Sequence, residues 1–135
     1  MQLTETLNEF TSIIYAEGEP MAGCSLSVEE AKAWLSLMEP YRPFCLVASW
    51  CWLDIQAPVD SQHLCLDSDG RPALLYAGNV LFDSRHRFPP GSWVRSTLLV
   101  RLAEEFIFET RNTRYVLMGR GARRTTSMGT VNSIR

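Results

Sequence analysis

The spacing of apolar residues over the first forty positions predicts two amphipathic helices. In the first, large apolar side chains recur at steps of four, three and four positions, which places them on one helical face. These residues are Leu3, Leu7, Phe10 and Ile14. The second helix follows Ser27, which precedes Glu30 by the three positions of a capping box, and Pro40 ends it. We therefore expect two helices at the N-terminal end of the fold.

From Phe44 onward the pattern becomes that of β-strands. "FCLVASWCWL" at 44–53 is apolar on both faces, which is typical of a central strand covered on both sides. Later strands are predicted within "ALLYAGNVLF", "SWVRSTLLVRL" and "NTRYVLMG". A helix over Thr97–Phe106 is the competing interpretation, because Leu98, Leu102 and Phe106 also follow a four-residue step. The β-rich flanks favour a strand, a turn near 103–105 and a further strand from Phe106.

Two helices followed by a series of strands indicate the α+β class. We expect two N-terminal helices packed on an antiparallel sheet of about four to five strands. Residues 1–121 form a single α+β domain in this prediction, and residues 122–135 form a flexible, arginine-rich C-terminal tail. The last strand then ends in the turn Gly119-Arg120-Gly121.

Composition agrees with one globular domain of 135 residues, since 46% of the residues are hydrophobic and 21% are charged. The longest apolar run is far shorter than the ~20 residues of a membrane-spanning helix. The N-terminus lacks the basic and apolar segments of a signal peptide, and the four cysteines contain no C-x-x-C pair. We expect a cytoplasmic protein with reduced thiols and no contact with a membrane.

Charge is divided unequally along the chain. Residues 1–70 hold eleven acidic residues against Lys32 and Arg42, a net charge of −9. Residues 71–135 hold four acidic residues against eleven arginines, a net charge of +7, so that the whole chain carries −2. Arginine binds carboxylates and phosphates in bidentate fashion and stacks on aromatic rings, which suits it to specific contacts. The two halves could also neutralise each other within one fold.

No catalytic signature is present. The glycines of "MGRGARR" lack the spacing and the following helix of a phosphate-binding loop. Cys45 and Cys51 lie in an apolar strand, where thiols usually serve packing. The polar group Asp83, Arg85 and His86 is better explained as an Asp-capped turn. We therefore predict no enzyme, no catalytic residue and no cofactor.

The spacing of the potential zinc ligands is also unfavourable. Structural zinc sites usually use ligand pairs two to four residues apart, whereas His63 and Cys65 are closer and Cys51 lies twelve residues before His63. We assign no metal site, although a site formed by these three residues stays open.

The motifs "LYAGNVLFDSRHRF", "GSWVRST" and "FETRNTRYVLMGRG" resemble a small uncharacterised domain family of pseudomonad-type bacteria and their prophages. The resemblance covers residues 74–121. The resemblance implies no particular chemistry. It does imply that this chain is one of the short proteins encoded on mobile elements, which often take part in conflicts between host and phage.

The abundance of arginine and tryptophan is typical of binding surfaces. The candidate binding residues are Trp93, Arg95, Arg101, Arg111, Arg114, Tyr115, Arg120, Arg123 and Arg124. We expect a non-catalytic protein-binding module, with a host protein or nucleoprotein complex as partner and a homodimer as a further possibility. Its most concrete form is a mobile-element-encoded, anti-CRISPR-like inhibitor of a host defence complex. The alternative is a protein that binds single-stranded nucleic acid through the arginines and aromatic residues of its C-terminal strands.

Overall fold

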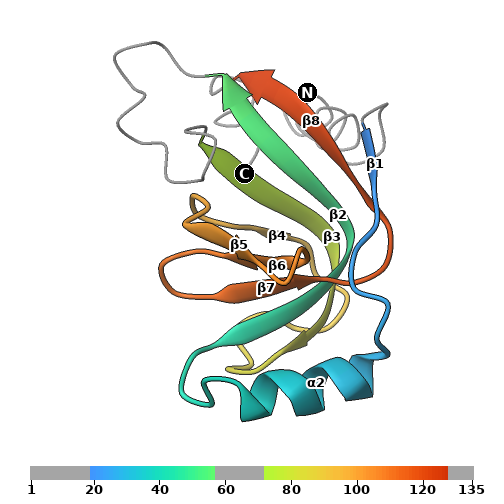
Figure 1. The fold of residues 1–135 in the computed structure, drawn as a ribbon, viewed down its shortest axis with the longest axis vertical. Coiled ribbons are helices and arrows are strands. Elements are labelled where there is room, and N and C mark those ends of the chain that lie inside the picture. The colour runs from blue at the N-terminus through green and yellow to red at the C-terminus, as the bar shows by residue number, and fades with distance from the viewer. Residues whose placement is uncertain (1–18, 57–71, 128–135) are drawn as a thin grey trace.

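The computed structural model describes residues 19–56 and 72–127, which form one helix and eight strands (Figure 1). In chain order these are β1 (Glu19–Met21), α2 (Val28–Leu37), β2 (Phe44–Gln56), β3 (Ala73–Asp83), β4 (Val94–Arg95), β5 (Arg101–Ala103), β6 (Ile107–Glu109), β7 (Arg114–Leu117) and β8 (Gly121–Ser127).

The helix predicted after Ser27 is confirmed together with its capping box. Ser27 Oγ accepts a hydrogen bond from the Glu30 N–H at 3.1 Å, and Glu30 Oε1 accepts one from the Ser27 N–H at 2.8 Å. These bonds satisfy backbone donors that an isolated helix end leaves without partners. The other predicted helix, Leu3 to Ile14, lies outside the described residues.

The predicted fold class is wrong, because strands dominate the described residues and the sheet is mixed. Its order is β1-β8-β2-β7-β6-β5, with β3 and β4 on the other side of β2. β2 pairs antiparallel with β3 but parallel with both β7 and β8. The same edge of β2 holds β7 at residues 44–47 and β8 at residues 51–56. Apolar patterning identifies a strand but does not specify the direction of its neighbours, so the parallel pairs were missed.

β2 is able to hold two strands on one edge because it bends. Ser49 has a φ of +54°, a left-handed conformation that is uncommon for residues other than glycine. The side chains that join the larger core cluster change parity there, from Cys45 and Val47 to Trp50 and Trp52. The bend therefore keeps an apolar face toward the core along a strongly curved sheet (Figure 1).

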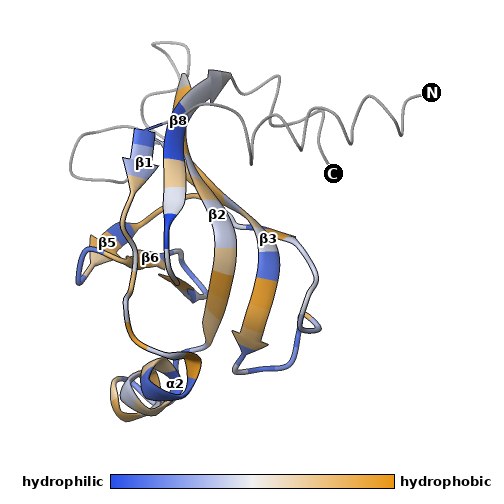
Figure 2. Ribbon diagram, turned by 90° about the vertical axis from the view of Figure 1, so that its right-hand side faces the viewer, coloured by the Kyte–Doolittle hydropathy of each residue, from blue (hydrophilic) through white to orange (hydrophobic). Residues whose placement is uncertain are grey.

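Both faces of β2 are covered, as its sequence predicted. One face contributes to the larger core, where the rings of Trp52 and Phe108 meet edge to face at 5.0 Å. On the other face, Leu46 packs with Ala31 and Leu35 of α2, which lies beneath the end of the sheet (Figures 1 and 2).

The two glycines of the Gly-Arg-Gly sequence have separate structural roles between β7 and β8. Gly119 has a φ of +68°, which suits glycine because it lacks a Cβ atom. Gly121 lies against the indole of Trp50, and a Cβ atom there would clash with the ring. Trp50 Nε1 also donates to the carbonyls of Met118 and Gly119, both at 3.2 Å. Residues 122–127, predicted to begin a flexible tail, instead continue as β8.

The turn between β5 and β6 contains two strained glutamates. Its backbone closes with the Phe106 N–H donating to the Ala103 carbonyl at 3.2 Å. Glu104 and Glu105 both have positive φ, at 52° and 66°. Two-residue turns of this kind favour Asn-Gly, because the left-handed conformation costs other residues about 1–2 kcal/mol each. Strain at this turn therefore lowers the stability of the fold.

We expect the double substitution Glu104→Asn/Glu105→Gly to raise the free energy of unfolding by about 1–2 kcal/mol, because both new residues tolerate positive φ. Urea denaturation followed by tryptophan fluorescence measures this change. Glu29→Gly is the control, since Glu29 is an exposed residue in the first turn of α2, where glycine relieves no positive φ and should bring no gain in stability. A double variant no more stable than the wild type would show that the turn is not strained.

Candidate binding site

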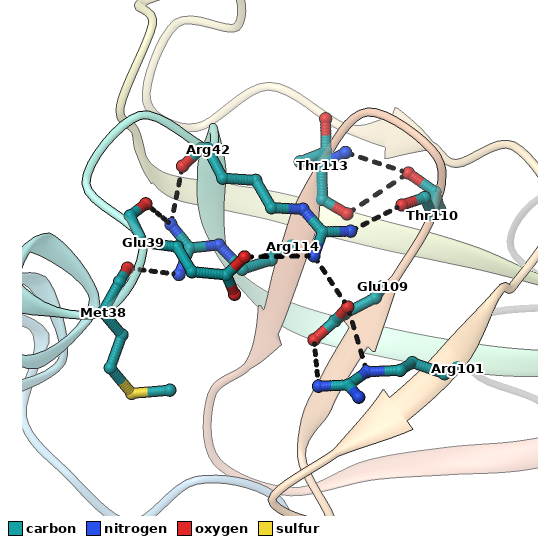
Figure 3. A network of polar contacts seen from close by, with 8 residues as sticks. All are labelled: Met38, Glu39, Arg42, Arg101, Glu109, Thr110, Thr113 and Arg114. Carbon is teal, nitrogen blue, oxygen red and sulfur yellow. Dashed lines mark hydrogen bonds and ion pairs between the residues drawn. The ribbon is translucent and has the colours of Figure 1, made fainter.

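A buried arginine joins the C-terminal half of the chain to the loop that follows α2. Arg114 on β7 is 1% exposed, and its guanidinium donates to three backbone carbonyls. These belong to Met38 at 2.7 Å, Glu39 at 3.1 Å and Arg42 at 2.6 Å (Figure 3). Met38 is the C-cap of α2, whose last turn contains no basic residue. Arg114 therefore supplies the positive charge that favours a helix C-terminus, from a distant part of the chain.

Arg114 also stabilises an unusual backbone conformation. Glu39 has a φ of +47°, and its carbonyl accepts from Arg114 and from the Arg42 N–H, at 2.9 Å for the latter. The buried Nε of Arg114 has no hydrogen-bond partner among the described residues. The pKa of Arg114 is lowered, chiefly by burial. The charges of Glu39 and Glu109 raise this pKa, and the charge of Arg42 lowers it. The loop from Met38 to Pro43 is thus folded around a desolvated cation.

A second group of charges lies beside Arg114. Glu109 is buried and binds two arginines, Arg42 at 2.9 Å and Arg101 at 3.2 Å. Arg42 also donates to the Thr110 carbonyl at 3.1 Å and lies 3.9 Å from the Glu39 carboxylate. The loop after α2 and the turn between β6 and β7 are therefore held together by ion pairs and hydrogen bonds (Figure 3).

An open pocket of about 630 Å³ lies between this loop and this turn. Its lining residues are Glu39, Tyr41, Arg42, Pro43, Arg111 and Asn112. Tyr41 is 90% exposed and Leu37, at the end of α2, is 84% exposed, so both side chains project into solvent. The backbone of Tyr41 is nevertheless held in place, since its carbonyl accepts from Arg85 at 2.7 Å.

The two remaining strong ion pairs stabilise the fold. The carboxylate of Asp83 has no solvent exposure and binds Arg87, whose guanidinium also donates to Thr113. Asp83 Oδ2 further accepts from the backbone N–H of Arg87, so that Asp83 caps its own turn as expected. At the far end of β2, Asp54 binds Arg123 through two hydrogen bonds of 2.6 and 3.0 Å.

The predicted binding residues do not converge on one surface. Tyr115 and Arg114 are buried, and burial raises the pKa of Tyr115 to about 12. Arg101 and Arg123 are in ion pairs. Of the other five residues, three make contacts elsewhere: Trp93 stacks on Tyr76, Arg95 hydrogen-bonds to Tyr76, and Arg124 has an interaction partner.

Arg111 and Arg120 are exposed and form no hydrogen bond or ion pair with the described residues. Of the nine predicted residues, Arg111 alone lines the pocket. Sequence reasoning missed Leu37, Tyr41 and Asn112. The signal for Tyr41 was an aromatic residue in a short segment bounded by Pro40 and Pro43, a position where a side chain has little chance of joining the core.

The described cysteines have the properties of packing residues. Burial raises the pKa of Cys45 to about 12 and that of Cys51 to about 11, so neither thiol ionises readily. Within residues 19–56 and 72–127, no cluster of three or more His, Cys, Asp or Glu side chains could hold a metal ion. His63 and Cys65 lie outside these ranges. In the same ranges no helix is long and apolar enough to cross a membrane.

The structure is thus a mostly β domain with a curved mixed sheet, one described helix and an open pocket beside that helix's C-terminus. Residues 21–133 match the family described as "Domain of unknown function (DUF6957)", and the chain belongs to this family. This match is longer than the stretch of residues 74–121 whose motifs resemble a small uncharacterised domain family. No curated protein and no solved structure matches the chain.

Replacing Arg114 by methionine should lower the free energy of unfolding by about 3 kcal/mol or more, because three carbonyls lose a charged donor. Arg111→Met is the matched control, since it makes the same chemical change on an exposed side chain and should stay within about 0.5 kcal/mol of the wild type. Urea denaturation of both variants provides the comparison. Equal stabilities would show that Arg114 does not anchor the loop.

Asp83 should make stability depend on pH. Burial alone would raise the pKa of Asp83, but hydrogen bonds and charge from Arg87 outweigh it and hold the pKa below its ordinary value of 3.8. Because the folded pKa is the lower one, this stabilisation is fully present above pH 3.8 and is lost as the pH falls through the folded pKa.

We therefore expect Asp83→Asn to be less stable than the wild type by about 2 kcal/mol at neutral pH, with the difference shrinking below about pH 4. Thermal or urea unfolding between about pH 7 and pH 2 measures it. Glu29→Gln, on an exposed carboxylate, is the control. A difference that does not change with pH would contradict the assignment.

Proposed function

We propose that this protein is a non-catalytic protein-binding module and that it contacts its partner through the pocket beside α2. The docking face consists of Leu37, Tyr41, Pro43, Arg111 and Asn112. The observation that carries the proposal is the 90% exposure of Tyr41, which lines the pocket; Leu37, at the end of α2 and four residues earlier in the chain, is 84% exposed. Tyrosine and arginine are enriched among the residues that dominate binding energy at protein interfaces.

The backbone of this face is organised before binding. Arg114 binds the carbonyls of Met38, Glu39 and Arg42, and Arg85 binds that of Tyr41. A partner that meets a loop already held in one conformation loses less conformational entropy when it binds. The strained backbone of Glu39 supports the same view, because strain of this kind concentrates at functional sites.

Charge supports protein binding over binding to single-stranded nucleic acid. A nucleic-acid groove requires several unpaired cations along the backbone of the strand. Three of the seven candidate arginines instead bind Glu109, Asp54 and backbone carbonyls within the fold, and Arg95 and Arg124 also have interaction partners. Arg111 lines the pocket and Arg120 does not, so the docking face offers one unpaired arginine of the candidate set.

The narrower expectation is an inhibitor of a host defence complex. It rests on the resemblance of residues 74–121 to proteins of mobile elements, and it remains a prediction. An exposed, preorganised face without described catalytic groups is compatible with inhibition by occupying a partner's surface.

Site-specific photocrosslinking tests the docking face. A benzophenone amino acid replaces Tyr41 in one variant and Arg120 in the control, and both proteins are irradiated in extracts of the source cells after nuclease treatment. We expect position 41 to crosslink to a defined protein that position 120 does not reach, and Leu37→Asp to abolish this product. The crosslinked protein is then purified and should bind the wild type directly.

Identical products from the two positions, or none at position 41, would refute the docking face. If a labelled single strand binds at about 50 mM salt and its affinity falls steeply as salt is added, the nucleic-acid alternative replaces the proposal.

A further inference from the structure

We propose that the pocket recognises an acidic peptide segment of the partner, with Arg111 binding a carboxylate and the neighbouring apolar side chain of the segment resting against Tyr41 and Pro43. This inference rests on the proposed function and specifies the chemistry of the partner. Three observations support the inference: the charge around the pocket, the hydrogen bonding of the two arginines that line it, and the presence of both apolar and polar side chains in the lining.

The charge around the pocket is positive. Arg42 and Arg111 line it, Arg85 holds the loop at Tyr41, and Arg114 lies buried beneath the same loop. Two carboxylates oppose these four arginines, those of Glu39 and Glu109, and Glu109 is shared with the further arginine Arg101. A ligand that brings a negative charge would relieve this excess.

Arg111 is the arginine available to a ligand. The other arginine of the lining, Arg42, is already held by Glu109 at 2.9 Å and by the Thr110 carbonyl at 3.1 Å. Arg111 is exposed and makes no such bond with the described residues. A guanidinium of this kind presents a planar fork of donors that matches a carboxylate in bidentate geometry.

The lining also supplies apolar contact. The ring of Tyr41 and the ring of Pro43 stand beside the polar groups of Arg111 and Asn112. The pocket of about 630 Å³ is open to solvent, which suits a short peptide segment that lies across it rather than an enclosed ligand. An acidic residue next to an apolar residue would use both parts of this lining.

A carboxylate fits better than a phosphate because the lining itself carries a negative charge. The Glu39 carboxylate is 58% exposed and lies at the pocket, and Arg111 is the one lining arginine without a bond to the described residues, so the singly charged carboxylate matches the available cation better than a phosphate of charge about −1.5 to −2. A nucleic acid would also need further cations along its backbone, and on this face the described candidate arginines offer Arg111 alone.

Selection from a random peptide library displayed on phage tests the inference, with three forms of the full chain as baits: wild type, Arg111→Glu and Arg120→Glu. We expect wild type to enrich peptides in which Asp or Glu neighbours an aromatic or aliphatic residue. Arg111→Glu should lose these peptides and select Lys or Arg at the same place. Arg120→Glu, the same charge reversal outside the pocket, should select the wild-type peptides.

The best peptide is then synthesised with Glu and with Gln at the acidic position, and its affinity is measured by fluorescence anisotropy. We expect the Gln peptide, and the Arg111→Ala protein with the Glu peptide, each to bind about tenfold or more weakly. Thermal unfolding confirms that each variant is folded.

A selected consensus without an acidic residue, a consensus unchanged by Arg111→Glu, or no enrichment at all would overturn the inference. These results leave a crosslink at position 41 unaffected, so that the failure of the peptide specificity can be distinguished from the failure of the docking face.

Discussion

The guanidinium of Arg114 is the interaction on which the arrangement of the candidate site depends. It supplies the cation at the end of α2, binds three carbonyls of the following loop and lies on a strand enclosed by β2 and β6. A buried arginine is costly unless its donors are satisfied, so the loop that satisfies them has little freedom to take another path. The buried Arg114 therefore fixes the path of the loop that places Tyr41 at the surface.

Ion pairs inside the fold join the acidic and basic halves of the chain at two places. Asp54 from the acidic half binds Arg123 from the basic half, and Arg42 binds Glu109 in the reverse sense. The Asp54–Arg123 pair joins β2 to β8 in their observed register, and the Arg42–Glu109 pair joins the loop after α2 to β6. At the pocket, Arg111 has no such ion pair with the described residues and lies beside the exposed Tyr41.

The bend in β2 has a comparable effect on the architecture. A straight strand of its length would offer one continuous edge to one neighbour, whereas the bend at Ser49 divides that edge between β7 and β8. Trp50 and Gly121 pack together where the two strands separate. The curved sheet then encloses the larger core on one side, and α2 covers the other side around Leu46. The pocket forms where the loop leaving α2 meets the turn that leads into β7.

Local features of the chain were decided by the sequence alone. The capping box of α2, the doubly covered β2 and the Asp-capped turn at Asp83 all depend on residues near one another, so their patterns could be read directly. The parallel direction of β7 and β8, the inclusion of residues 122–127 in the sheet and the burial of Arg114 depend on pairings between distant segments. Periodicity predicts which face of an element is apolar. It does not predict which strand lies beside that element or which carbonyls accept hydrogen bonds from Arg114. Only the tertiary structure decided the strand pairing and the hydrogen bonds of Arg114, and these two features position the candidate site.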